Sequence, residues 1–269
     1  MRKQHRLRFF VLLFLAISLT LLAALGPVLT PEDPFKIDLH KTLRAPDNEN
    51  LFGTDRLGRD LFSRVLFGAR NSFVLTLIMV LIVACAGSMI GVAVGCLHGL
   101  VDTVIMQIAD ILLAFPSVVF AIAVTGVWGP GIYHVLIALA IVSWAKYAHL
   151  ARSLVTEIRR KEYITLAWFS GSRWHRILFK YIIPNILPQM IIMTTLDISE
   201  MMLTISALSF LGLAGQPPMP EWGNMLADSR GFIVTYPHMM LCPGLAILII
   251  VTIFSLLGDS LRDVLDPKE

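Results

Sequence analysis

Long apolar runs alternate with short polar segments along this chain, and each run has the length of a membrane-spanning helix. About 20 helical residues cross the hydrocarbon core of a bilayer, which is about 30 Å thick. The runs of that length are approximately Phe9–Leu29, Phe73–Leu97, Val104–Gly126, Ile132–Leu150, Ile182–Leu203 and Met239–Leu257. They lack the alternation of barrel strands, so the pattern predicts an all-α membrane protein with six transmembrane helices.

Basic residues in the flanking segments orient these helices. The N-terminus, Met-Arg-Lys-Gln-His-Arg-Leu-Arg, is basic and is expected to stay in the cytoplasm. Six crossings then place the C-terminus and segment 151–180 inside as well, and that segment holds seven Lys and Arg against Glu157 and Glu162. The first run is longer than a signal-peptide core and lacks a clean small-x-small cleavage site, so it is expected to be an uncleaved anchor.

Composition supports this class of protein. The 269 residues are 56% hydrophobic and 15% charged, with a mean hydropathy of +0.74, which excludes a soluble enzyme, a disordered chain and a disulfide-stapled secreted module. A net charge of +3 gives no argument for nucleic acid as a partner. Cys85, Cys96 and Cys242 lie inside apolar runs and are interpreted as small core residues.

The segment between the first two runs ends in an amphipathic stretch. Leu61 and Val65 share a helical face, and Asp60 is placed to cap the helix. An interfacial helix leading into the second span is one interpretation. An ordinary solvated loop, with incidental ion pairs among the charges of residues 55–60, is the other.

The cytoplasmic segment predicts two short helices. The first covers Glu157–Ser170, Gly171 supplies a positive φ at its end, and Ser172 caps a second helix that runs to about Lys180. Pro184 then marks the start of the fifth span. A compact helix–glycine–helix unit suits docking into a groove of a partner protein, and a plain basic loop that holds the topology is the alternative.

Ionisable residues inside the apolar runs indicate either function or tight pairing. Asp102 and Asp110 share one face of the third run, where pairing with the basic cytoplasmic segment is the structural explanation. Lys146 is interpreted as a boundary residue that extends to the interface. Asp197 and Glu200 lie near the middle of the fifth run.

Two carboxylates on adjacent turns cannot both face lipid. Asp197 and Glu200, with Met201 beside them, are therefore candidates for lining a translocation path for a cationic substrate. An internal hydrogen-bonded pair that only positions helices is the alternative. The methionines suggest either soft-metal contacts or packing, and the identity of any bound metal stays unknown.

Glycine and prolines interrupt the helix after the fifth run. The segment Gln216–Met225 predicts a re-entrant or surface element on the outer face. Glu221 and Trp222 are candidates for contact with an external partner, and a plain connection between helices is the alternative.

Motifs for catalysis are missing from the sequence. There is no Gly-x-x-x-x-Gly-Lys-Ser/Thr motif and no Gly-Lys dipeptide, so no nucleotide-binding P-loop is present. The seven histidines show no i,i+4 pair, and no Ser-His-Asp or Cys-His arrangement is suggested by spacing. The chain is therefore predicted not to be an enzyme.

Several short motifs follow one another between about Phe52 and Pro267. They are Gly53-Thr-Asp-Arg-Leu-Gly-Arg-Asp60 with Ser63-Arg64 and Gly68-Ala-Arg70; Val101-Asp102 to Ala109-Asp110-Ile-Leu-Leu-Ala-Phe-Pro116; Ala151-Arg-Ser153; Glu162-Tyr163 to Gly171; Ile182-Ile-Pro-Asn-Ile-Leu-Pro188; Leu208-Ser-Phe-Leu-Gly-Leu213; and Pro220-Glu-Trp-Gly223 with Pro243-Gly244. In this order they resemble the inner-membrane permease subunits of bacterial ABC importers in the dipeptide, oligopeptide and nickel group.

The resemblance implies a type I ABC importer permease fold in the bacterial cytoplasmic membrane, with the lipid bilayer around it. It also implies a homologous second permease subunit, two cytoplasmic ATPase subunits and an extracytoplasmic solute-binding protein. This chain would bind no cofactor, and ATP-Mg would bind in the partner ATPase subunits.

The same resemblance assigns the cytoplasmic helix–glycine–helix unit to the loop that docks on an ATPase subunit. The residues carried over to this loop are Glu162, Tyr163, Ala167, Gly171, Ser172 and Pro184. The sequence departs from the family pattern at Thr165-Leu166-Ala167, where Glu-Ala-Ala is common.

The resemblance also gives a domain layout and a cargo. The expected parts are the N-terminus and first anchor (1–29), an extracytoplasmic segment (30–70), the permease domain with its coupling loop at about 156–180 (71–258), and a cytoplasmic tail (259–269). The acidic residues of Thr195-Leu-Asp-Ile-Ser-Glu-Met-Met202 favour nickel or a metal chelate. A peptide importer is the alternative, and a non-transporting membrane scaffold or receptor is the alternative from another class.

Overall fold

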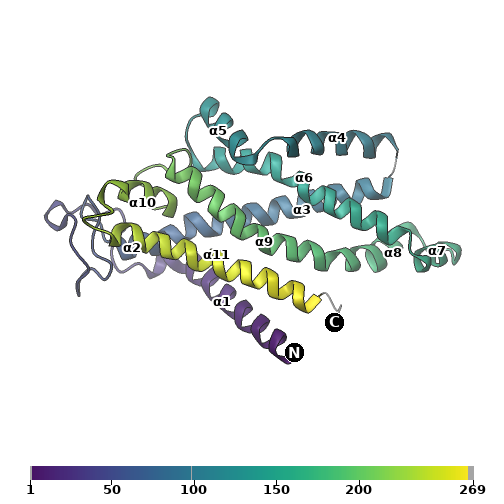
Figure 1. Ribbon diagram of the computed structural model, residues 1–269, viewed down its shortest axis with the longest axis horizontal. Coiled ribbons are helices and arrows are strands. Elements are labelled where there is room, and N and C mark those ends of the chain that lie inside the picture. Colours follow the sequence, from purple (N-terminus) through teal and green to yellow (C-terminus); the bar gives the residue numbers. More distant parts are fainter. Residues whose placement is uncertain (1, 98, 266–269) are drawn as a thin grey trace.

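The computed structural model describes residues 2–97 and 99–265, and this part of the chain is mostly helical, without a β-strand. Met1, His98 and the last four residues of the predicted tail lie outside it. The α-helices are α1 Arg2–Leu29, α2 Leu61–Ala69, α3 Leu75–Leu97, α4 Leu100–Ala114, α5 Ser117–Trp128, α6 Ile132–Arg159, α7 Glu162–Phe169, α8 Trp174–Ile177, α9 Ile183–Phe210, α10 Trp222–Ser229 and α11 His238–Leu265 (Figure 1). The π-helical turns Arg70–Val74 and Leu178–Ile182 join α2 to α3 and α8 to α9, and the 3-10 turns are Leu39–Lys41 and Arg230–Phe232.

The helices long and apolar enough to cross a membrane agree with the predicted runs except at the third. Five are continuous, namely Arg6–Leu29, Leu61–Leu97, Ile132–Arg159, Trp174–Phe210 and His238–Leu265. The predicted third span is instead the bent pair α4 and α5, which meet at 84°. Pro116 explains the bend, because a proline pushes the residue before it out of the α region, and Phe115 is extended with φ −91° and ψ 127°. The predicted span over Val104–Gly126 is therefore bent in its middle, and the six predicted crossings are reached when this pair counts as one span.

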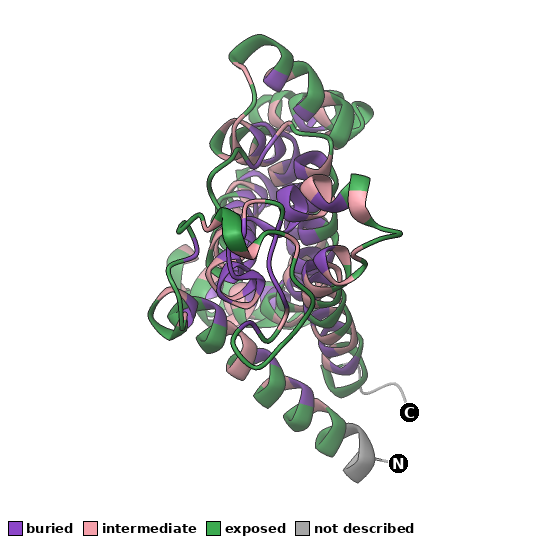
Figure 2. Cartoon of the chain, turned by 90° about the vertical axis from the view of Figure 1, so that its left-hand side faces the viewer, coloured by how far each residue is buried: buried purple, intermediate pink, exposed green. Residues whose placement is uncertain are grey.

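Helix α6 is the centre of the bundle. It packs against α3 on one side and against α4 and α5 on the other, and α9 lies against α6, α3 and α11 (Figure 1). Small residues permit the closest of these contacts, since a Cβ added at Gly87 or Gly91 would lie 2.5 Å or less from a carbonyl oxygen of α6. Tyr147 and Leu139 of α6 are fully buried, and Figure 2 shows the buried residues concentrated in the middle of the bundle.

The two ends of the bundle carry different parts of the chain. The N-terminal end of α1, the C-terminal end of α11 and the α7–α8 unit lie toward one end (Figure 1). Segment 30–60, α2 and α10 lie at the opposite end. The termini and the predicted cytoplasmic loop thus share a side, as the predicted six crossings require. We call the end that carries α7 and α8 the inner end, and the end that carries α2 and α10 the outer end.

The predicted helix cap at Asp60 is confirmed, but the interfacial helix is not. The Asp60 carboxylate accepts a hydrogen bond from the Ser63 amide at 2.7 Å, and α2 begins at Leu61. Its residues are largely buried, because α2 packs against α1 and α11. A Cβ at Gly26 of α1 would lie 2.2 Å from the Leu66 carbonyl oxygen. Helix α2 is therefore the buried start of a long helix that continues into α3.

The segment after α6 differs in detail from its predicted form. The chain breaks at Lys161, whose backbone is extended, so Glu157–Ser170 is not one helix. Gly171 does take a positive φ, +75°, directly after α7. Ser172 does not cap α8, because Arg173 occupies the N-cap position and makes no side-chain cap bond. The second short helix does not stop near Lys180 but runs through a π-helical turn into α9.

Candidate translocation and coupling sites

The predicted acidic path residues are separated by the packing of α9 on α6. The Asp197 side chain is 4% exposed, and its carboxylate accepts hydrogen bonds from the Lys146 ammonium and from the Tyr147 hydroxyl, the latter at 2.7 Å. Lys146 and Tyr147 are adjacent on α6 and reach the same carboxylate. A buried carboxylate needs such partners, since desolvation makes an unpaired charge costly. The geometry matches the helix-positioning alternative for Asp197, and Lys146 is not the boundary residue that was predicted.

Glu200 lies on the other side of this contact. Its side chain is 69% exposed, and its carboxylate is 3.6 Å from the Lys146 ammonium. Met201 is 2% exposed and belongs to the hydrophobic core, so this structure does not open its side chain to a path. Of the predicted path residues, only Glu200 presents its functional group to the surroundings of the chain. No three His, Cys, Asp or Glu residues gather as a metal-binding group anywhere in residues 2–97 and 99–265.

Two further polar pairs join α4 to α6. The Arg152 guanidinium forms a bidentate pair with Asp102, with one bond at 2.7 Å. His149 Nε2 lies 3.0 Å from an Asp110 carboxylate oxygen. The structural explanation for these acidic residues is thus supported, and for Asp102 the partner belongs to the predicted basic segment. Together with Lys146, these partners make α6 the helix to which α4 and α9 are tied.

Helix α7 carries a cluster of exposed large apolar side chains at the inner end. Leu166 is 65% exposed, Trp168 52% and Phe169 85%, whereas Ile164 is buried and anchors the helix to the core. Trp168 packs near Trp174 of α8, with ring centroids 6.1 Å apart. The predicted coupling residues Glu162, Tyr163, Ala167, Gly171 and Ser172 all lie in α7 or in the turn after it, whereas Pro184 lies in the first turn of α9.

The structure buries both predicted outer-face contacts, Glu221 and Trp222, within the chain. Glu221 is 2% exposed and caps α10, accepting hydrogen bonds from the Gly223 amide at 3.0 Å and from the Ser72 hydroxyl at 3.2 Å. Burial raises the pKa of the Glu221 carboxyl above its usual range, despite these bonds. The Trp222 indole nitrogen donates to the Val65 carbonyl oxygen at 2.9 Å. These residues therefore fasten α10 to the region of α2.

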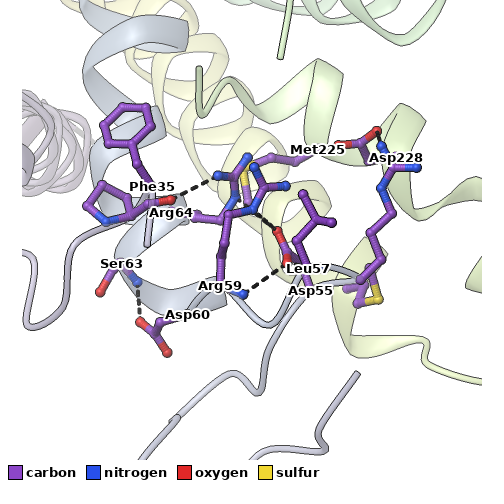
Figure 3. A network of polar contacts seen from close by, with 12 residues as sticks. Phe35, Asp55, Leu57, Arg59, Asp60, Ser63, Arg64, Met225 and Asp228 are labelled. Carbon is purple, nitrogen blue, oxygen red and sulfur yellow. Dashed lines mark hydrogen bonds and ion pairs between the residues drawn. The ribbon is translucent and has the colours of Figure 1, made fainter. Parts of the chain in front are cut away.

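An ion network with a buried centre joins the loop before α2 to that helix, and a more exposed ion pair extends it to α10 (Figure 3). The Asp55 carboxylate accepts from Arg59 Nε at 2.6 Å and lies 3.4 Å from Arg64 Nε. Arg64 also donates to the Pro34 carbonyl oxygen at 3.0 Å, and Arg56 pairs with Asp228 of α10 at 3.1 Å. We call this group the outer network.

Burial of the outer network contradicts the solvated-loop interpretation. Asp55, Arg59 and Arg64 all have side chains less than 10% exposed. The signal for this arrangement is present in the sequence, since Gly53 and Gly58 bracket the charges and both adopt a positive φ, which folds the loop back on itself. The pairing of Arg56 with Asp228, which is far away in the chain, has no such local signal.

Comparison with known proteins gives the family. Residues 87–269 match the family described as "Binding-protein-dependent transport system inner membrane component". The chain is 41% identical to the dipeptide transport system permease protein of Alkalihalophilus pseudofirmus, over 95% of this chain and 84% of that protein. It is 40% identical to the nickel transport system permease protein of Escherichia coli K12, over 93% of this chain and 90% of that protein.

A glutathione transport system permease protein of Pectobacterium atrosepticum is 39% identical over 96% of this chain and 85% of that protein. Among solved structures, an amino acid ABC transporter shares the fold, with a TM-score of 0.51 and 14% identity over 70% of this chain and 90% of that one. The predicted type I permease fold and the inner-membrane location are thereby confirmed. The chain belongs to the family of binding-protein-dependent transport system inner membrane components, as a permease subunit of an ABC importer.

Proposed function

We propose that this chain forms half of the translocation path of an ATP-driven importer, with a second permease subunit of similar design forming the other half. Two cytoplasmic ATPase subunits bind ATP-Mg and hydrolyse it, and an extracytoplasmic solute-binding protein delivers the substrate to the outer end. The chain itself hydrolyses nothing and binds no cofactor. The family and the named relatives support this division of labour.

The exposed apolar surface of α7 is the observation that carries the proposal. Leu166 and Phe169 project from a short helix at the inner end, outside the long apolar spans. Exposed apolar clusters of this kind mark protein interfaces, and a short helix with an apolar face fits a groove in a partner. We assign this surface to an ATPase subunit.

A displacement of α7 is transmitted to the translocation path by the helices that follow it. Buried Ile164 and Ile177 anchor the α7–α8 unit to the core, and α8 continues into α9 through the π-helical turn. Helix α9 is held to α6 by the Asp197 pair. Closure of the ATPase subunits therefore displaces α9 and α6 together and changes which side of the membrane the path faces.

The path is proposed to follow the exposed face of α9. Glu200, Leu203 and Ala207 are exposed and fall at helical spacing on one face. A charged side chain in contact with hydrocarbon is costly, so the Glu200 carboxylate is assigned to the water-filled path or to the second permease subunit.

The cargo is proposed to be a short peptide, with nickel or a nickel chelate as the second candidate. The prediction of a cationic cargo assumed that the carboxylates of Asp197 and Glu200 were both free. Asp197 and Lys146 neutralise each other, so Glu200 is left as a single exposed carboxylate, which suits the amino terminus of a peptide as well as a metal cation. Nickel keeps the support of a similarly close relative and of the exposed Glu200 carboxylate.

Uptake measured in cells with and without this chain tests both the coupling role of the α7 loop and the identity of the cargo. We expect energy-dependent dipeptide uptake to be lost on deletion and to be restored by the natural chain but not by Gly171→Pro. Loss of radiolabelled nickel uptake, insensitive to competing dipeptide, would replace peptide by nickel as the cargo. Full uptake with Gly171→Pro would contradict the coupling role of the α7 loop.

A further inference from the structure

An open cavity of about 780 Å³ lies beside the turn that separates α7 from α8. Its walls include the side chains of Arg173, Arg176, Lys180, Ser170, Ser172 and Phe179. The positive φ of Gly171 turns the chain at this point, so that cations from α8 and the following π-helical turn line the same hollow as the hydroxyl groups before them.

The positive charge of this cavity is not neutralised within the described chain. Arg173, Arg176 and Lys180 are exposed and form no ion pair with any acidic side chain of residues 2–97 and 99–265. Glu157, an acidic residue near the inner end, pairs instead with Lys161 at 3.4 Å. The cavity therefore presents three uncompensated cations and the Ser172 hydroxyl, a set that matches the oxygens of a phosphate group.

The cavity also lies where the chain enters the apolar region. Lys180 stacks over the ring of Tyr181 at 5.7 Å, and Phe179 is 68% exposed. Trp174, directly after Arg173, begins the continuous apolar helix Trp174–Phe210. Aromatic side chains beside lysine and arginine are typical of the membrane–water interface, where basic residues on the cytoplasmic side attract anionic lipid headgroups.

We propose that this cavity binds the phosphate headgroup of an anionic phospholipid from the inner leaflet. Arg173, Arg176 and Lys180 donate to the phosphate oxygens, Ser172 adds a hydroxyl donor, and Phe179 contacts the acyl region. The proposal rests on the assignment of the α7 end to the cytoplasm. The bound lipid would hold the turn at Gly171 and so position α7 for its ATPase partner, making coupling sensitive to membrane composition.

Native mass spectrometry of the purified complete importer in detergent, titrated with phosphatidylglycerol or phosphatidylcholine, tests the proposal. The natural complex should retain phosphatidylglycerol in preference to phosphatidylcholine. The double variant Arg173→Gln/Arg176→Gln should bind phosphatidylglycerol about 25-fold more weakly, since each basic residue near an anionic surface contributes about fivefold. Arg6→Gln/Arg8→Gln removes the same charge from the exposed N-terminal part of α1 and should leave the affinity unchanged.

Several results would overturn the proposal. One is equal weakening by both double variants, which would indicate unspecific attraction. Another is binding of inorganic phosphate alone as tightly as the lipid, which would assign the cavity to a free phosphate. A third is loss of ATPase subunits from Arg173→Gln/Arg176→Gln without any change in lipid binding, which would make the cavity a protein contact. That last result would leave the proposed importer function intact.

Discussion

Charged and aromatic residues differ in burial and pairing between the two ends of this permease. At the outer end, the charged side chains of the outer network and the Trp222 indole are paired, and all of them except Arg56 and Asp228 are buried. At the inner end, the aromatic residues of α7 and the cations of α8 are exposed. The outer end thus satisfies many of its charged and aromatic groups within the chain, whereas the inner end leaves large apolar and basic groups exposed to a partner and a membrane.

The largest effect is expected where a buried charge loses its counter-charge. Asp55→Ala leaves Arg59 and Arg64 buried together without an acidic partner, so it should lower the free energy of unfolding by about 3–5 kcal/mol. Thermal unfolding of the purified complex and the amount of protein in the membrane measure this. The exposed acid Glu49 pairs with Lys41 in the same segment, and Glu49→Gln should change stability by about 1 kcal/mol or less. Similar effects from both would contradict the structural importance of the buried outer network.

Phe169→Asp tests the exposed surface of α7. Uptake should fall about tenfold or more, because a charge in the centre of an apolar interface costs about 2 kcal/mol, while the amount of protein stays unchanged. Val234 is 93% exposed between α10 and α11 and provides the matched control at the outer end. If Val234→Asp reduces uptake as much as Phe169→Asp, the exposed surface of α7 is no more important for uptake than the outer end.

The two acidic residues of α9 should respond differently to amide substitution. Asp197→Asn leaves the buried Lys146 partner without full compensation, so uptake and the amount of protein should fall in parallel, with about 1–3 kcal/mol lost from stability. Glu200→Gln should reduce uptake while the amount of protein stays unchanged, because its side chain is exposed. Radiolabelled uptake normalised to immunoblot signal separates the two. Parallel losses for both variants would assign Glu200 a structural role as well.

The smallest expected effect is the pH dependence of stability that arises from Glu221 at the outer end. The pKa of Glu221 is raised in the folded protein, so the folded state binds this proton more tightly than the unfolded state. Stability should therefore decrease as the pH rises from the usual glutamate pKa through the raised value and then level off. Thermal unfolding across this pH range measures the change, with Glu221→Gln as the variant that removes the slope. A slope that persists in Glu221→Gln would place its origin in another group.

The sequence predicts what depends on local physics. Run length gives the spans, the carboxylate of Asp60 gives the start of α2, and Gly171 gives the turn after α7. Pro116 was a local signal for the bend between α4 and α5, but the apolar run continues through it and conceals the break.

Contacts between segments that are far apart in the chain could not be predicted from the sequence. Lys146 and Asp197 are 51 residues apart, and only the packing of α6 on α9 shows that they neutralise each other. Glu221 and Trp222 have the composition of a surface rim, yet the approach of α2 and α10 buries them. Polar residue types indicate that a partner is needed, but the fold decides whether the partner is in the same chain.

Cross-linking from α7 tests the central claim most directly. Leu166→Cys is introduced into a chain whose own thiols are removed by Cys85→Ser, Cys96→Ser and Cys242→Ser, with Val234→Cys in the same background as the outer-end control. Membranes containing the complete importer are treated with a short thiol-reactive cross-linker, and the products are identified by immunoblot against the ATPase subunits. We predict a product with an ATPase subunit for Leu166→Cys and none for Val234→Cys. An active importer in which Leu166→Cys gives no ATPase product would contradict the account.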